Sequence, residues 1–260
     1  MKKDIKIGVA GCGALGSIVV SALQKGIEGF EFIGISDTAS PETTAPNMSF
    51  NDLTSQCDWV VECLPPKIVP EIADIVLSKG KTLVMISACA MLLYPELYEK
   101  VKNSAGRVLI PSGALSGLDA VVALGCAGIE SAKIATTKHP RGLSGAPYII
   151  DNKIDLETLS EPKMIFRGNA FEAAKAFPAN VNVAATLSIA GIGPERTQVE
   201  VWADPAIKGN SHKITVTGGT STITSEVLNL PDPSNPKSSQ LAGYSIVAFL
   251  KKQSGKVQVV

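Results

Sequence analysis

The sequence has no excess of either charge and few charged residues in all. Its 260 residues include 24 lysine and arginine residues and 24 aspartate and glutamate residues. A general nucleic-acid-binding protein needs surplus cations to displace counterions from phosphates, so the balance argues against that class. Only 18% of the residues are charged while 45% are hydrophobic, which provides a large core and excludes disorder over most of the chain.

Long apolar runs and regularly spaced cysteines are also missing. The longest apolar runs, such as residues 118–127, are far shorter than the ~20 residues that span a membrane. The first residues contain neither an apolar signal core nor a small-residue cleavage site. The five cysteines are scattered and never spaced as C-x-x-C. We therefore expect a cytoplasmic protein with reduced thiols, no metal centre, and no membrane or nucleic-acid partner.

The first 110 residues alternate short β-type runs with helical patterns. The β-type runs are apolar on both sides, as expected for a parallel sheet that helices cover on both faces. Strands are expected at 5–10, 32–36, 59–63, 82–86 and 107–110, and helices at 14–25, 68–78 and 94–103. The sequence therefore predicts an α/β fold whose N-terminal domain, residues 1–110, is a doubly wound Rossmann sheet.

The pattern changes after residue 110. Strands are expected at 131–137, 164–167, 197–203, 212–217 and 222–229, and helices at 119–127, 170–177 and 183–190. This mixture predicts a second, α+β domain at 111–237 that serves catalysis and dimerisation. A proline-rich loop is expected at 230–236, and a last helix at about 238–252 is expected to pack back onto the first domain.

A glycine-rich turn follows the first expected strand and opens a helix, which is the context of a dinucleotide-binding fingerprint. Gly11 permits the tight turn, Gly13 lets the backbone approach a pyrophosphate, and Gly16 lets helix and strand pack closely. The amide groups at the start of the helix face the phosphate charge. An ordinary strand-to-helix turn is the alternative. The expected cofactor contacts in this segment are Gly11, Gly13, Ala14, Leu15 and Gly16.

Asp37 ends the second expected strand about 20 residues after the fingerprint, where a carboxylate can accept hydrogen bonds from the adenosine ribose. Its charge would repel a 2′-phosphate, so NAD is expected, with NADP as an additional cofactor. Ligands in such sheets bind at the carboxyl ends of the strands. Further cofactor contacts are therefore expected there, with loop packing as the alternative: Cys63, Leu64, Pro65, Ser87 and Ala88.

Only two histidines are present, so imidazole chemistry must use one of them. Alternation places His212 on the same face as Ile214 and Val216, pointing toward a covered surface, where a structural histidine would look the same. His139 precedes Pro140 and is expected in a loop.

Several polar residues remain as candidates. Asn182 precedes a helical run and is either a helix cap or a ligand contact. Four cations are either anchors for an anionic substrate or solvated surface groups: Lys138, Arg141, Lys208 and Lys213.

Six sequence words, in order, resemble the L-aspartate dehydrogenase family. They are GCGALG at 11–16, PSGALSGLDA at 111–120, TTKHP at 136–140, FPANVNVAATLSIAG at 177–191, DPAIKGNSHKI at 204–214 and NPKSSQLAGYS at 235–245. The resemblance covers nearly the whole chain. It implies oxidative deamination of L-aspartate with NAD or NADP to iminoaspartate, which feeds NAD biosynthesis or hydrolyses to oxaloacetate and ammonia. It also implies a homodimer.

The resemblance assigns roles by position. His212 matches the family's active-site histidine, and Ser116 and Asn182 match its cofactor contacts. Lys138, His139 and Asn210, which lie in or beside the matching words, are expected substrate contacts. The family often has alanine where Ser116 stands and usually reads TTRKP where this chain reads TTKHP.

The hypothesis places aspartate in a cleft between the two domains, with His212 as the base. Two alternatives remain open. One is another two-domain imine reductase or amino-acid dehydrogenase, although the HHxxKxDxPSGT word of a lysine-pathway reductase is absent. The other is a catalytically silent, NAD-sensing binding protein.

Overall fold

The computed structural model describes residues 3–39, 41–230, 239–256 and 258. The chain forms two compact units, the first made of residues 1–111 and 240–260 and the second of residues 112–239. Of the expected loop at 230–236, only residue 230 is among the described residues. Residues 237 and 238, where the expected domain boundary falls, also lie outside the described residues.

The first unit is built on a five-stranded parallel sheet with the strand order β2-β1-β3-β4-β5. The order reverses direction between β1 and β3, which creates the crevice where such sheets bind ligands. The strands are β1 (Ile5–Ala10), β2 (Phe30–Ser36), β3 (Trp59–Glu62), β4 (Thr82–Met85) and β5 (Arg107–Leu109). The predicted doubly wound α/β fold is confirmed.

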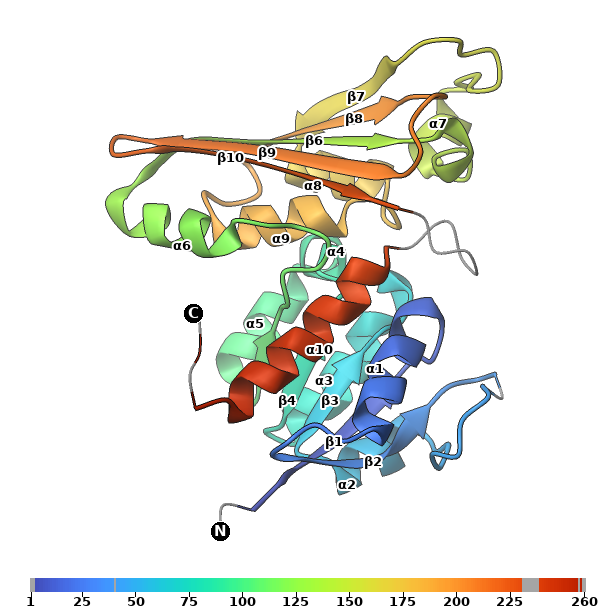
Figure 1. Ribbon diagram of the computed structural model, residues 1–260, viewed down its shortest axis with the longest axis vertical. Helices are drawn as coiled ribbons and strands as arrows, with labels where there is room; N and C mark the ends of the chain where they lie inside the picture. Colours follow the sequence, from blue (N-terminus) through green and yellow to red (C-terminus); the bar gives the residue numbers. More distant parts are fainter. Residues whose placement is uncertain (1–2, 40, 231–238, 257, 259–260) are drawn as a thin grey trace. The chain divides into compact units, whose positions relative to one another are not determined.

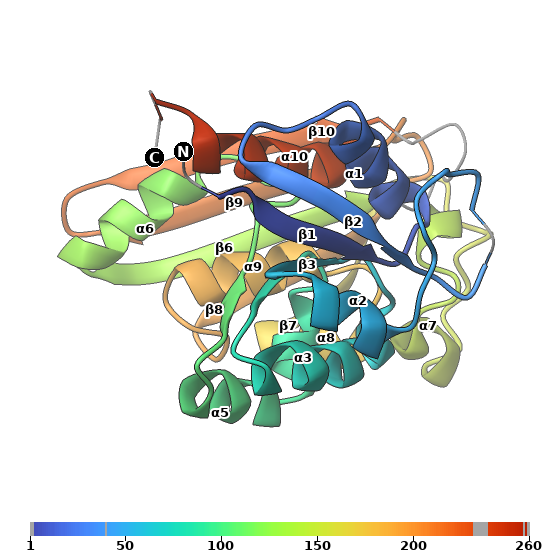
Figure 2. The same ribbon diagram turned by 90° about the horizontal axis from the view of Figure 1, so that it is seen from below.

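Helices cover both faces of this sheet (Figures 1 and 2). They are α1 (Ala14–Gln24), α2 (Phe50–Gln56), α3 (Val69–Ser78), α4 (Cys89–Leu93), α5 (Glu96–Asn103) and α10 (Gln240–Ser254), with a 3₁₀ turn η1 (Pro66–Ile68). Helix α10 comes from the end of the chain and lies beside α1 (Figure 1). Its Ile246 and Leu250 are fully buried in the same core as Val9 and Val61, so the C-terminal segment completes the first unit.

The second unit contains a mixed five-stranded sheet with the order β10-β9-β6-β8-β7. Strand β6 runs parallel to β8, and every other neighbouring pair is antiparallel. The strands are β6 (Ile129–Lys138), β7 (Lys163–Asn169), β8 (Thr197–Ala203), β9 (Asn210–Gly218) and β10 (Thr222–Asn229). The sheet is therefore mixed, which agrees with the predicted α+β domain.

Three helices cover one face of the second sheet: α6 (Leu118–Ala127), α8 (Ala170–Ala176) and α9 (Asn182–Ala190) (Figure 1). A 3₁₀ turn η2 (Pro140–Gly142) and the short helix α7 (Pro147–Asp151) follow β6. Alternate residues of the central strands, among them Ile134, Val199 and Ile214, are buried beneath the helices. Among the described residues of both units, no helix combines the length and apolar composition that crossing a bilayer requires.

Candidate active site

The turn between β1 and α1 needs its glycines for different reasons. Gly11 has φ of +88°, and a Cβ atom there would lie 2.5 Å from the carbonyl oxygen of Cys63. A Cβ on Gly16 would lie 1.9 Å from the carbonyl oxygen of Gly11, so this glycine allows the close helix–strand contact. A Cβ on Gly13 would meet no atom within 4 Å. The space above Gly13 is therefore open to a ligand that approaches the backbone.

The start of α1 faces the same turn. Gly13 is its N-cap residue and provides no side-chain hydrogen bond, so the first amide groups of Ala14 and Leu15 remain for an anion. Asp37 follows β2, and its Oδ2 accepts a hydrogen bond of 2.5 Å from the backbone N–H of Cys12. Its Oδ1 accepts another, of 2.8 Å, from the N–H of Ala39. An open glycine turn, an uncapped helix and a carboxylate at the end of β2 fit a dinucleotide.

The ends of β3 and β4 are joined by a buried hydrogen-bond network. Ser87 follows β4, and its hydroxyl lies 2.8 Å from the carbonyl oxygen of Leu64 and 2.9 Å from the carboxylate of Glu62. This network brings the expected contacts Leu64 and Ser87 together, and the other expected contacts Cys63, Pro65 and Ala88 are their neighbours in the sequence. Glu62 itself was not among the predicted site residues.

His212 lies in β9 of the second unit and is 5% exposed. It stands opposite Thr136 of β6, and the Thr136 hydroxyl oxygen is 3.1 Å from His212 Nδ1. Because Nδ1 has this partner, Nε2 is the ring nitrogen left for a contact with another group. The predicted orientation of His212, toward the face that also carries Ile214, agrees with its burial.

Lys138 ends β6 on the same face and is 6% exposed. Its Nζ donates a hydrogen bond of 3.0 Å to Oδ1 of Asn180. Burial lowers the pKa of Lys138 to about 8. Burial, and to a lesser extent the charge of Lys138, lowers the pKa of His212 to about 3, so the imidazole is neutral at physiological pH. The second unit thus holds a neutral base next to a buried cation.

The other predicted residues of this unit are less enclosed. Val181 is the N-cap of α9, so the alternative that Asn182 caps the helix is wrong, because Asn182 is its first residue. Ser116 is exposed and shares a short hydrogen bond with Ser225. The side chain of His139 accepts a hydrogen bond from the backbone N–H of Arg141, so His139 is the N-cap residue of η2. Asn210 begins β9 and is partly buried.

Three of the four candidate cations lie on the surface, because Arg141, Lys208 and Lys213 are exposed. Only Lys138 among the four is buried beside His212. Sequence reasoning missed its partner Asn180 and the Thr136 that orients the imidazole, although both lie within sequence words quoted for the family. Among the described residues, no group of three or more histidine, cysteine or acidic side chains is arranged to hold a metal ion.

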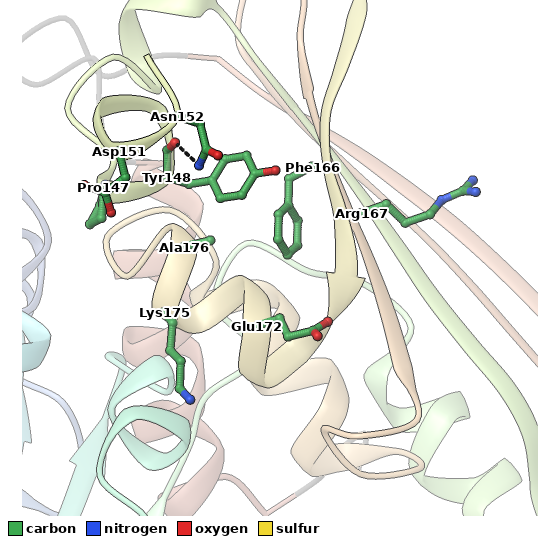
Figure 3. Close-up of a pocket in the computed structure, with 9 residues that line it drawn as sticks. All are labelled: Pro147, Tyr148, Asp151, Asn152, Phe166, Arg167, Glu172, Lys175 and Ala176. Atoms are coloured by element: carbon green, nitrogen blue, oxygen red, sulfur yellow. Dashed lines mark hydrogen bonds between the residues drawn. The ribbon is translucent and has the colours of Figure 1, made fainter. Parts of the chain in front are cut away.

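A separate pocket of about 430 Å³ lies in the second unit, lined by side chains of α7, β7 and α8 (Figure 3). The rings of Tyr148 and Phe166 pack edge to face with their centroids 5.2 Å apart, and Arg167 extends away from them (Figure 3). Glu172, which also lines the pocket, accepts a hydrogen bond from the N–H of Asn169 and completes the capping box of α8. The pocket contains none of the predicted site residues.

Comparison with known proteins assigns the family. A family model described as aspartate dehydrogenase, C-terminal, matches residues 119–253, and a model described as homoserine dehydrogenase, NAD binding domain, matches residues 11–111. The chain is 38% identical to L-aspartate dehydrogenase 3 of Bordetella bronchiseptica, over 99% of this chain and 98% of that protein. It is 40% identical to the L-aspartate dehydrogenase of Methanocella arvoryzae, over 95% of this chain and 96% of that protein.

The chain belongs to the L-aspartate dehydrogenase family. The crystal structure of aspartate dehydrogenase from Thermotoga maritima superimposes with a TM-score of 0.75 at 25% identity, covering 98% of this chain and 99% of that one. An archaeal homoserine dehydrogenase in complex with NADPH has a TM-score of 0.56 at 11% identity and shares the fold alone. The resemblance drawn from the six sequence words is confirmed. The first unit, whose glycine turn can accommodate a dinucleotide, coincides with the region that matches the NAD binding domain.

Proposed function

We propose that this member of the L-aspartate dehydrogenase family oxidises L-aspartate with NAD, and also with NADP, to iminoaspartate. The observation that carries the proposal is the buried group of His212, Thr136 and Lys138 in the second unit, in a chain whose first unit fits a dinucleotide. A neutral imidazole beside a buried cation suits a substrate that is both an ammonium ion and a dicarboxylate.

His212 is proposed as the general base. Before aspartate can be oxidised, its ammonium group must lose a proton, and Nε2 of His212 accepts it. The Cα–H bond then breaks with both electrons leaving as hydride, and the nitrogen lone pair forms the C=N bond of protonated iminoaspartate. When bound, the nicotinamide cofactor supplies the hydride acceptor. Addition of water to the same carbon releases ammonia and oxaloacetate.

The low pKa of His212 belongs to the protein without substrate. Its causes are burial and the neighbouring charge of Lys138. A bound dicarboxylate brings negative charge to this site, which raises the pKa of the imidazole and strengthens it as a base. Proton transfer is therefore favoured once substrate is present.

Lys138 is proposed to bind a substrate carboxylate, with His139 and Asn210 as further substrate contacts. The hydrogen bond from Lys138 to Asn180 holds the ammonium group in place without neutralising it, since an amide oxygen carries no net charge. On the cofactor side, we assign the pyrophosphate to Gly11, Gly13, Ala14, Leu15 and Gly16, and the adenosine ribose to Asp37. Cys63, Leu64, Pro65, Ser87, Ala88, Ser116 and Asn182 are proposed as the remaining cofactor contacts.

We also propose that the enzyme is a cytoplasmic homodimer that supplies iminoaspartate to NAD biosynthesis. The five free cysteines support a reducing compartment. The sheet face turned away from α6, α8 and α9 presents the partly buried Trp202 and the 55% exposed Leu228, which supports a dimer contact there. Light scattering of the native protein and of Leu228→Glu tests the dimer, since a monomeric native protein contradicts it.

The test of the reaction is a substrate panel. The purified protein is mixed with NAD or NADP and with L-aspartate, D-aspartate, L-glutamate, L-alanine or L-lysine, and absorbance at 340 nm is followed while ammonia is measured. We expect both signals with L-aspartate. Absorbance with another amino acid alone would indicate a different amino-acid dehydrogenase. Nucleotide binding without any turnover would indicate an NAD-sensing protein.

A further inference from the structure

A carboxylate is buried at the carboxyl end of β3 in the first unit. Glu62 is the last residue of this strand and is 0% exposed. Its Oε1 accepts a hydrogen bond of 2.5 Å from the backbone N–H of Leu64, and its Oε2 accepts one of 3.1 Å from the N–H of Ser87. The Ser87 hydroxyl lies 2.9 Å from Oε1. These donors match an ionised carboxylate.

The same network accommodates a proton on Glu62. The Ser87 hydroxyl is within hydrogen-bond distance of both Glu62 Oε1 and the carbonyl oxygen of Leu64. In the ionised state it can donate to Glu62. In the protonated state, Glu62 can donate to the Ser87 oxygen while Ser87 donates to Leu64. The carboxyl group can therefore titrate with little rearrangement, and burial raises its pKa to about 7.

No cation compensates the charge of Glu62 among the residues that the structure describes, since none of their ion pairs includes it. Lys81 precedes β4 and binds the carbonyl oxygens of Ser55 and Cys57, at the amino ends of the strands. The neighbouring thiol of Cys63 is neutral, because burial and Glu62 raise its pKa well above the usual value. The thiols of Cys12 and Cys89 have raised pKa values too, chiefly through burial.

This uncompensated anion lies beside the dinucleotide site. Glu62 is the register partner of Ala10, the last residue of β1, and the next residue, Cys63, packs against Gly11. Its hydrogen-bond partners Leu64 and Ser87 are both assigned cofactor contacts. A buried anion without a counter-charge is costly, and buried titratable groups with shifted pKa values concentrate at functional sites.

We propose that Glu62 discriminates between the two redox states of the cofactor by its charge, binding NAD⁺ more tightly than it would bind NADH. The inference rests on the cofactor site assigned under the proposed function. The oxidised nicotinamide ring carries a positive charge and the reduced ring carries none. An ionised carboxylate at the crevice therefore stabilises the oxidised form selectively.

Proton linkage follows from this preference. Both nucleotides carry the pyrophosphate charge, so they differ at Glu62 only in the charge of the ring. Ionised Glu62 favours the NAD⁺ complex, so this complex holds fewer protons on Glu62 than the NADH complex does. The ratio of the affinity for NAD⁺ to the affinity for NADH therefore rises as the pH increases through about 7, the pKa of Glu62.

The experiment is titration calorimetry of the full-length protein with NAD⁺ and with NADH between pH 6 and 8, in buffers that differ in ionisation enthalpy. For the native protein we expect the number of protons exchanged on binding to differ between NAD⁺ and NADH by roughly half a proton near the pKa. In Glu62→Gln we expect the ratio of the dissociation constant of NADH to that of NAD⁺ to fall roughly tenfold. The difference in proton exchange should disappear.

Two further variants serve as controls. Glu71→Gln makes the same chemical change at an exposed position of α3 and should alter neither affinity. Ser87→Ala removes a hydrogen bond but keeps the charge, so the preference for NAD⁺ should persist. A change of the same size in both dissociation constants, with their ratio unaltered, would show that Glu62 only joins the loops by hydrogen bonds, and would overturn the inference.

The test remains decisive if Glu62→Gln does not fold, because equal proton exchange with NAD⁺ and NADH in the native protein also overturns the inference. Binding of neither nucleotide by the native protein would instead refute the cofactor assignment on which the inference rests. Nucleotide binding without aspartate oxidation would refute the proposed reaction alone and leave the role of Glu62 standing.

Discussion

The hydroxyl oxygen of Thr136 lies 3.1 Å from Nδ1 of His212, across neighbouring strands of the second unit. Thr136 is 0% exposed, so water does not replace it as a partner of the ring. The contact occupies Nδ1 and leaves Nε2 as the ring nitrogen available to another group. It therefore makes Thr136 a positioning residue for the proposed base.

Replacing Thr136 with valine tests this role. Thr136→Val keeps the shape of the side chain but removes the hydroxyl, so the imidazole loses its fixed orientation. We expect kcat for aspartate oxidation to fall by about tenfold, with little change in KM. A tenfold change corresponds to about 1.4 kcal/mol, which is close to the free energy that one hydrogen bond contributes. Thr137→Val, on the other face of β6, should leave kcat unchanged. An unaltered kcat in Thr136→Val would mean that Thr136 does not orient His212.

Removing the imidazole tests the base itself. In His212→Ala we expect turnover with aspartate to drop by roughly 10² to 10⁴, the usual contribution of a positioned base. Folding and NAD binding should persist, since the glycine turn and Asp37 that are assigned to the dinucleotide lie in the first unit and His212 lies in the second. Steady-state kinetics with calorimetric NAD binding checks both. Turnover within about threefold of the native value would exclude His212 as the base.

Lys138 should make binding of dicarboxylates sensitive to pH. Its pKa is lowered to about 8, so it loses its charge as the pH rises through that value. The inhibition constant of succinate, which has no amino group to titrate, should therefore increase above about pH 8. Lys138→Arg keeps the charge and should abolish the increase, because arginine does not deprotonate in this range. Lys138→Met should bind succinate weakly at every pH, and a flat native profile would argue against a carboxylate on Lys138.

Asp37 should disfavour NADP by charge repulsion. In Asp37→Ser we expect the ratio of kcat/KM for NADP to that for NAD to rise by about tenfold, which corresponds to about 1.4 kcal/mol. Glu31→Ser removes the same charge from an exposed position of β2 and should leave the ratio unchanged. The measurement is initial-rate kinetics with each cofactor at saturating aspartate. No change in the ratio would place the ribose away from Asp37.

Helix α10 should be essential for the stability of the first unit. Leu250 is fully buried, so Leu250→Ala leaves a cavity and should reduce the free energy of unfolding by about 2–5 kcal/mol. Leu241, on the same helix, is 42% exposed, and Leu241→Ala should cost less than about 0.5 kcal/mol. Urea denaturation of both variants checks the difference. Equal, small effects would mean that α10 does not stabilise this core.

Much of the fold was predictable because buried parallel strands form continuous apolar runs, and every expected strand occurs in the structure. Short helices were missed for local reasons. Helix α4 directly follows β4, so the apolar residues of the two merge into one pattern. Helix α2 did have a signal, since Ser49 accepts a hydrogen bond from the N–H of Asp52 and caps it.

The site was predictable only where a local pattern described it. Alternation along β9 gave the orientation of His212, and the same reasoning along β6 leads from Ile134 through Thr136 to the buried Lys138. The expected strand stopped one residue too early to include it. The contact between Lys138 and Asn180 joins residues 42 positions apart, so no local pattern could indicate it. Glu62 could have been noticed as a charged residue closing a buried strand.

The placement of α10 has a consequence for synthesis of the protein. The first unit contains residues 1–111 but needs residues 240–260 to complete it, with the second unit inserted between them. During translation, the apolar sites that Ile246 and Leu250 will fill stay empty until the second unit and α10 have been synthesised. The first unit can therefore complete its core only after the inserted second unit has been made, and the second unit can fold first.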